Sequence, residues 1–237
     1  SFDSTSYRLI YYPPITMTYT PACWFPSLVH ILETEPNEEI KTKCLQARAD
    51  NPDGVWRSNE GGWQSDSHDV WGMPWEETET GTVKSPHLTN YGSERLIKQH
   101  LHSLFEQSIC TVLSGQLELF NYWVNINGKG AYNVRHDHPQ AHFSGVYYVQ
   151  CPENSGEIIF EHPYGFTAFD ELSCYKEEFV QSTMQHKAIS VTPTAGLLLI
   201  FPAHLEHSVA VNNSDEERIS IGFNILVHAL SEDQFYK

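Results

Sequence analysis

The residues with the clearest capacity for chemistry are two histidines in a His-x-His pair, His136 and His138. If this segment is a strand, side chains two residues apart share one face, so both imidazoles project together and Asp137 points away. Two imidazoles on one face can occupy adjacent positions on a transition metal. A third ligand must come from elsewhere, and His207 is the candidate because it opens a predicted strand after a proline turn. Three facial ligands would leave other positions on the metal open.

The His-x-His pair is weak evidence by itself, since a polar turn before Pro139 would account for it equally well. Asp137 replaces His138 as a ligand only if a bulge at Pro139 turns the strand. His142 lies four residues after His138 and has the same parity. We predict His142 to be a pocket residue, with a surface position as the alternative.

An arginine follows His207 by eleven residues and adds a second kind of chemistry. Arg218 and Ser220 share one strand face by parity, and together they can hold a carboxylate through charge-assisted, forked hydrogen bonds. The alternative is a surface ion pair between Arg218 and Glu216 or Glu217. If Arg218 faces inward beside a metal, its charge needs an anion, and a dicarboxylate ligand would supply one.

The elements that must position these residues are short strands in the second half of the chain. Runs rich in Val, Ile, Tyr and Phe are separated by turn signals and predict a mainly β sandwich or barrel. The predicted strands are Leu117–Ile126, Ala141–Gln150, Glu157–Phe160, Ala188–Val191, Leu197–Phe201, His207–Val211 and Arg218–Val227. We expect one domain over 1–237. Its helical and loop-rich front part, 1–115, would carry helices near 36–49 and 93–109 and loops over 51–92. This part would pack on a barrel core at 116–230.

Several linked motifs, in order, resemble the 2-oxoglutarate- and Fe(II)-dependent oxygenases. The closer match is to a group of uncharacterised oxygenases from marine bacteria and their phages. The motifs are Asn59–Ser65, Trp123–Asn125, Tyr132–Pro139, Ser144–Tyr148, Pro202–Val209 and Glu217–Asn224. The resemblance implies a double-stranded β-helix, which is a jelly-roll barrel. It also implies an enzyme that couples oxidative decarboxylation of 2-oxoglutarate to oxidation of a second substrate.

The resemblance also implies roles for individual residues. His136 and His207 match the two iron-binding imidazoles, and Arg218 matches the residue that pairs with the distal carboxylate of 2-oxoglutarate. Further expected cosubstrate contacts are Ser220, Tyr148 and Asn125. Most of the superfamily has Asp or Glu where this chain has His138, and we predict His138 as the remaining ligand. Expected substrate-pocket residues are Trp63, Asn133 and His142. The alternative for Trp63 is a hydrophobic plug at the barrel end.

Composition narrows the possible partners. The formal net charge of -16 disfavours nucleic acid and anionic membrane surfaces as partners. The five cysteines form no Cys-x-x-Cys pair, and no signal peptide is visible, which predicts a cytoplasmic protein with reduced thiols. The substrate, a small molecule or a protein, and the oligomeric state are left open. Two other functions compete: a cupin-like three-histidine dioxygenase that does not use 2-oxoglutarate, and a non-catalytic jelly-roll binding module.

Overall fold

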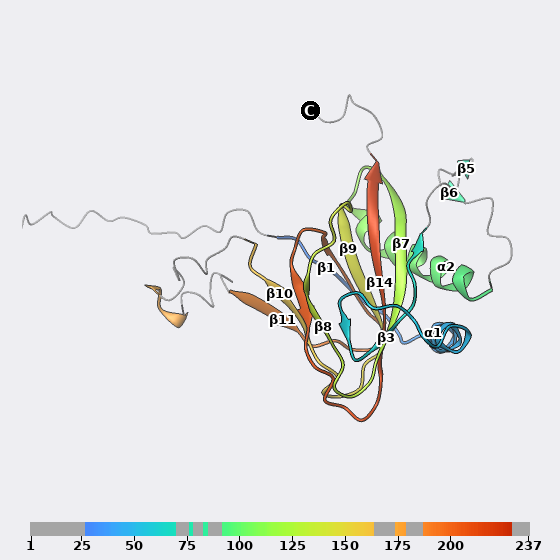
Figure 1. Ribbon diagram of the computed structural model, residues 1–237. Helices are drawn as coiled ribbons and strands as arrows, with labels where there is room; N and C mark the ends of the chain where they lie inside the picture. Colours follow the sequence, from blue (N-terminus) through green and yellow to red (C-terminus); the bar gives the residue numbers. More distant parts are fainter. Residues whose placement is uncertain are drawn as a thin grey trace, which may run out of the picture.

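Two antiparallel sheets form the centre of the molecule. The computed structural model describes residues 27–69, 76–77, 83–84, 92–163, 174–178 and 187–228 (Figure 1). The larger sheet contains β1 (His30–Glu33), β12 (Leu197–Pro202), β9 (Phe143–Gln150), β14 (Arg218–His228), β7 (Gln116–Asn127) and β3 (Trp63–Gln64), in that order, with β4 (His68–Asp69) also paired to β7. The smaller sheet has the order β11 (Ala188–Val191), β10 (Ile158–Glu161), β13 (His207–Val209), β8 (Tyr132–His136) and β2 (Asn59–Glu60). A separate pair joins β5 (Glu76–Glu77) and β6 (Val83–Lys84). The prediction of a mainly β jelly-roll barrel is confirmed.

Two helices lie on the side of the larger sheet that faces away from β8 and β10 (Figure 1). They are α1 (Glu38–Asp50) and α2 (Gly92–Gln107), and a short 3-10 helix, η1 (Ile109–Thr111), follows α2. The first helix was expected to begin at Pro36 but begins two residues later. The reason is a side-chain cap, since Asn37 Oδ1 accepts hydrogen bonds from the backbone N–H groups of Glu39 and Ile40. No helix in the described ranges is long and apolar enough to span a membrane.

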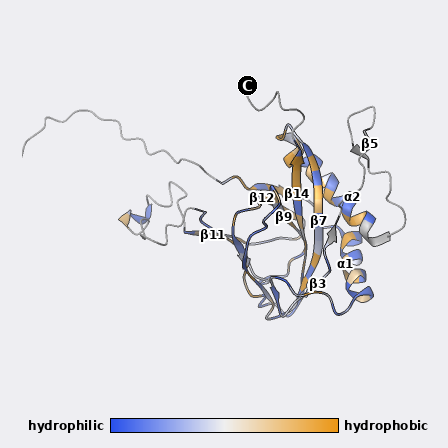
Figure 2. Ribbon diagram, turned by 45° about the horizontal axis from the view of Figure 1, so that its top comes forward, coloured by the Kyte–Doolittle hydropathy of each residue, from blue (hydrophilic) through white to orange (hydrophobic). Residues whose placement is uncertain are grey.

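Alternation along the central strands divides the interior into two layers. In β14, Ile219 and Ile221 belong to the cluster that includes residues of α1 and α2, whereas Arg218 and Ser220 line a cavity between the sheets. Leu199 of β12 instead joins a second cluster of buried residues between the sheets. Figure 2 shows hydrophobic segments along β14 and on the helices that cover this sheet. The barrel therefore has an apolar outer face under the helices and a more polar inner face.

The segment expected to be loop, 51–92, also contributes to the barrel. Its short strands β2, β3 and β4 pair with β8 or β7. Each is only two residues long, so neither hydrophobic alternation nor turn spacing could reveal it. These pairings place the Trp56–Ser58 loop beside the chain that carries His136.

Candidate functional site

Three histidines meet where β8 and β13 pair in the smaller sheet. His136 is the last residue of β8, and His207, the first residue of β13, is its direct cross-strand partner. His138 lies two residues past the end of β8, where its backbone N–H donates a 3.0 Å hydrogen bond to the carbonyl of Ala203. One ligand nitrogen from each imidazole lies within 4.8 Å of the other two. In the described part of the chain, this is the one such cluster of His, Cys, Asp or Glu side chains.

The three imidazoles are prepared to bind a metal. His136 Nδ1 lies 2.7 Å from the carbonyl oxygen of Val134, and His207 Nδ1 lies 3.0 Å from that of Leu205. Because a carbonyl only accepts, Nδ1 carries the proton on both rings and the Nε2 lone pair is free. Burial lowers the pKa of all three imidazoles, to about 3 at His138 and about 4 at His207. Three neutral imidazoles are a suitable donor set for a first-row divalent metal such as Fe(II).

Asp137 does not join this cluster. It is exposed, whereas the ring of His138 stacks on the indole of Trp123 with centroids 5.5 Å apart and an interplanar angle of 27°. His138, rather than Asp137, therefore shares the space of the other two imidazoles. The cluster contains no carboxylate, so its ligands bring no negative charge to a bound cation.

An arginine lies deep in the cavity that the histidines border. Arg218 is only 2% exposed, and its guanidinium donates to the backbone carbonyl of Ser155. It has no acidic partner among the described residues, because Glu217 pairs instead with Arg48. Burial lowers the pKa of Arg218, which reflects the cost of removing a cation from water without a counter-ion. The surface ion pair considered from the sequence is therefore wrong, and the cavity offers a buried charge to an anion.

Two polar atoms beside Arg218 lack hydrogen-bond partners among the described residues. Tyr148 Oη and Asn125 Oδ1 are buried without a hydrogen bond, and both residues line the same cavity as Arg218 and Ser220. A buried polar atom without a partner typically costs about 1–3 kcal/mol. These atoms and the arginine together form a polar lining whose hydrogen bonds a ligand can complete.

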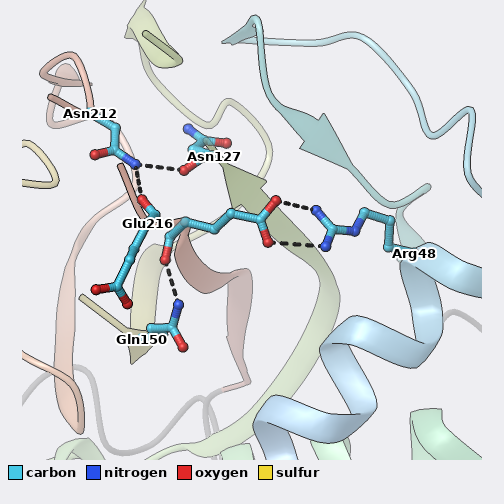
Figure 3. A network of polar contacts seen from close by, with 6 residues as sticks. Arg48, Asn127, Gln150, Asn212 and Glu216 are labelled. Carbon is cyan, nitrogen blue, oxygen red and sulfur yellow. Dashed lines mark hydrogen bonds and ion pairs between the residues drawn. The ribbon is translucent and has the colours of Figure 1, made fainter. Parts of the chain in front are cut away.

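A network at the surface fixes the backbone just before Arg218 (Figure 3). Arg48 of α1 forms a two-pronged ion pair with Glu217, with N–O distances of 2.6 and 3.0 Å. Gln150 donates a 2.7 Å hydrogen bond to the carbonyl of Glu217, and Asn212 donates a 2.9 Å bond to the preceding carbonyl. Helix α1 is thereby connected to the residue that precedes Arg218. This contact holds the start of β14 in the position from which the Arg218 side chain enters the cavity.

A glycine makes room for the arginine on the opposite side. Gly156 has a φ of +93°, and a Cβ at this position would lie 2.3 Å from the carbonyl oxygen of Ala210 and 2.9 Å from Arg218 Nη1. Both the backbone conformation and the close approach exclude a side chain.

The other predicted pocket residues divide into one that lines the cavity and two that do not. Asn133 is buried in the cavity wall and accepts a 3.0 Å hydrogen bond from Asn127. Trp63 lies opposite Ile126 on the helix-facing side of the sheet, and its indole donates to the carbonyl of Asn51 at 2.9 Å. His142 is exposed and accepts a 2.9 Å hydrogen bond from a backbone N–H of β14. His142 thus has the surface position that was its alternative, whereas Trp63 packs in the core under the helices, which is neither the cavity nor the expected plug at the barrel end.

A second, larger cavity, which the sequence did not predict, also borders His136 and His138. Its volume is about 590 Å³, and its lining includes Trp56, Arg57 and Gln64. Gln64 falls within the motif Asn59–Ser65, and that motif was the sequence feature that pointed to this region. No periodicity indicates that Trp56 and Arg57 reach the same space, because they lie in an irregular loop.

The part of the chain that carries these residues is similar to a known protein family. Residues 121–224 match the family model described as "Putative 2OG-Fe(II) oxygenase". The match spans the residues that carry the histidine cluster, Tyr148 and Arg218. No curated protein sequence matches the chain.

Several solved enzyme structures are similar to this chain. A prolyl-4-hydroxylase from Pseudomonas putida is 15% identical, with a TM-score of 0.44, covering 85% of this chain and 92% of that chain. A prolyl hydroxylase from Trichoplax adhaerens, solved with a hypoxia inducible factor peptide, is 12% identical, with a TM-score of 0.48 and coverages of 88% and 87%. The α-ketoglutarate-dependent carbocyclase SnoK from nogalamycin biosynthesis is 9% identical, with a TM-score of 0.50 and coverages of 84% and 78%. At such identities the likeness to SnoK shows the fold and nothing finer.

Proposed function

We propose that this chain, whose residues 121–224 match the 2OG-Fe(II) oxygenase family model, is a 2-oxoglutarate- and Fe(II)-dependent oxygenase that binds Fe(II) through His136, His138 and His207 and anchors 2-oxoglutarate on Arg218. The enzyme couples oxidative decarboxylation of 2-oxoglutarate to oxidation of a second substrate. The observation that carries the assignment of residues is the buried guanidinium of Arg218, which lacks a carboxylate partner in the described protein and lies in the cavity that the three histidines border.

The metal, when bound, supplies the activation of dioxygen and the oxidation chemistry. The protein's own contribution is to bind and orient. His136 and His207 present Nε2 because backbone carbonyls hold their Nδ1–H groups. Arg218 neutralises the distal carboxylate of 2-oxoglutarate and, with Ser220, fixes its direction. The buried wall around Arg218 excludes water, which strengthens these contacts.

Two alternatives are disfavoured by the same observation. A three-histidine dioxygenase that does not use 2-oxoglutarate has no need of a buried, unpaired arginine beside the metal. A non-catalytic module would keep Arg218 and the orphaned Tyr148 hydroxyl at a cost in stability without a ligand to offset it.

The direct test is turnover of the cosubstrate. Protein supplied with Fe(II), oxygen and 2-oxoglutarate is expected to form succinate slowly even without its second substrate, and Arg218→Met is expected to form much less. Omission of Fe(II) and its replacement by Zn(II) are the controls. Oxygen uptake that proceeds without 2-oxoglutarate would instead support the three-histidine dioxygenase.

Replacement of Tyr148 by phenylalanine separates a ligand-binding hydroxyl from a structural one. The hydroxyl has no partner among the described residues, so Tyr148→Phe should leave the Tm of the ligand-free protein unchanged or raise it. If the hydroxyl contacts 2-oxoglutarate, the variant should bind it roughly fivefold to tenfold more weakly, as expected for a loss of about 1 kcal/mol. Thermal melts with and without 2-oxoglutarate provide both values. A lower ligand-free Tm with unchanged affinity would show that the hydroxyl is structural.

The Arg48–Glu217 ion pair provides a milder prediction. Its two side chains are 33% and 40% exposed, so it contributes up to about 1 kcal/mol. Arg48→Gln should therefore weaken 2-oxoglutarate binding by at most about fivefold without changing the amount of bound iron. Calorimetric titration measures the affinity for 2-oxoglutarate and the stoichiometry of iron binding. Lys129→Gln, which breaks an exposed ion pair with Asp215, is the matched control and should change neither. A loss of iron in Arg48→Gln would contradict a role confined to positioning Arg218.

A further inference from the structure

The cavity of about 590 Å³ that opens on His136 and His138 has the size of a small-molecule site. It is distinct from the space around Arg218, although His136, His138, Ser58 and Trp123 border both. A molecule in the larger cavity would therefore approach the three-histidine cluster from a different side than a ligand of Arg218. This is the geometry required of a second substrate.

Two indoles and Val134 provide the apolar part of its wall. Trp123 is held in place by stacking on His138, and a Cβ on Gly222 would lie only 2.5 Å from its ring. Trp56 is 69% exposed at the cavity and thus contributes little to the core. An exposed tryptophan beside a second, fixed indole favours a ligand with an apolar body over a strongly hydrated one.

The described lining contains arginine but no acidic side chain. The chain has 30 acidic residues against 14 lysines and arginines, yet no Asp or Glu is among the described residues that line either cavity. Arg57 is the charged member of the larger cavity's lining. Its guanidinium has no acidic partner within the described ranges. Such a cation is available to a ligand carboxylate or other oxyanion.

The proposed metal ligands also favour an anionic substrate. Three neutral imidazoles leave the full charge of a divalent cation on the site, whereas a carboxylate ligand would reduce it by one. When a bound dicarboxylate pairs with Arg218 and the metal, the metal cluster and Arg57 together still carry net positive charge. An anionic substrate would balance that charge.

A hydrogen-bond acceptor completes the wall. Gln64 is 6% exposed and lines the cavity, and its buried side-chain oxygen has no hydrogen-bond partner in the described parts of the chain. The cost of leaving such an atom unpaired indicates a ligand that donates an N–H or O–H group to it.

We propose that the larger cavity binds the enzyme's second substrate and that this substrate is a small anion: an apolar body against Trp56 and Trp123, a carboxylate or other oxyanion on Arg57, and a hydrogen-bond donor to Gln64. The inference rests on the proposed function, because it takes the three-histidine cluster as the oxidising centre.

Binding of matched probes to the full chain tests the inference without turnover. Hexanoate, 3-phenylpropanoate and indole-3-acetate would be compared with their amides and with amines of equal length, by ligand-observed NMR in excess 2-oxoglutarate. At least one carboxylate should bind about tenfold more tightly than its amide, and the amine should bind most weakly. Arg57→Gln should remove this preference and Arg57→Lys should keep most of it. Trp56→Ala should weaken carboxylate and amide alike, and Lys129→Gln should change nothing.

Several results would overturn the inference: no carboxylate binding, equal binding of the matched probes, or a preference that survives in Arg57→Gln. The last result, combined with loss of the preference in Arg218→Met, would place the anion on Arg218 instead. The outcome is separable from the proposed function. If the protein binds 2-oxoglutarate at the metal but shows no preference among the probes, only the substrate class is wrong. If the preference depends on Arg57 but 2-oxoglutarate does not bind at the metal, the oxygenase assignment of these residues is wrong and an anion-binding cavity remains.

Discussion

Replacement of Arg218 by methionine is expected to raise the Kd for 2-oxoglutarate by roughly 30-fold to 3,000-fold while the protein retains its iron. Loss of one member of a buried charge pair costs about 2–5 kcal/mol, and each 1.4 kcal/mol corresponds to a factor of ten. Arg218 is 2% exposed and does not belong to the histidine cluster. Its loss should therefore remove the anchor for 2-oxoglutarate and leave the bound metal in place. Calorimetry with 2-oxoglutarate and metal analysis of the same sample measure the two effects.

Two variants sharpen the interpretation. Arg218→Lys keeps the charge but not the planar fork, so its affinity should fall between those of the wild type and Arg218→Met. The ligand-free Arg218→Met protein should be at least as stable as the wild type, because it no longer buries an uncompensated cation. Wild-type affinity for 2-oxoglutarate in Arg218→Met would remove Arg218 from the site.

His207→Ala is expected to abolish measurable iron binding. Residues that only support metal ligands typically change affinity by 10–100-fold when mutated, so loss of one of three ligands should exceed about 100-fold. His207 is 5% exposed, and its ring centroid lies 4.5 Å from that of His136 and 5.2 Å from that of His138. Anaerobic titration with Fe(II), followed by metal analysis after desalting, measures the loss.

The chain offers close controls for this experiment. His204→Ala removes an exposed imidazole three residues before His207, and Asp137→Ala removes the exposed acid between the other two histidines. Both variants should bind iron normally. His138→Asp should also bind iron, since it creates the two-histidine, one-carboxylate set typical of such sites. Normal iron content in His207→Ala, or iron loss in Asp137→Ala, would refute the three-histidine assignment.

The parts of this site that regular strands position were predictable from sequence. In β14 the two-residue alternation places Arg218 and Ser220 on the inner face, as parity indicated. His138 lies beyond the end of β8 at His136, yet its imidazole lies near that of His136, and its backbone N–H donates a hydrogen bond to the carbonyl of Ala203.

Parity failed where the chain leaves the strand. Gln140 has a φ of 80°, which resets the direction of the chain, so the face expected for His142 from His138 was not preserved. The Trp56–Ser58 loop and Gln64 reach the larger cavity through the short pairings of β2 and β3. Such contacts arise from tertiary packing and have no periodicity for a sequence to display.

The central claim is that the three histidines and Arg218 together hold Fe(II) and 2-oxoglutarate. Its most direct test is an anaerobic titration of metal-free protein with Fe(II) and then 2-oxoglutarate, followed by visible absorbance. We predict a charge-transfer band of the chelated cosubstrate in the wild type, a much weaker band in Arg218→Met at the same 2-oxoglutarate concentration, and no band in His207→Ala. Iron bound without a band in the wild type, or an equal band in Arg218→Met, would contradict the claim.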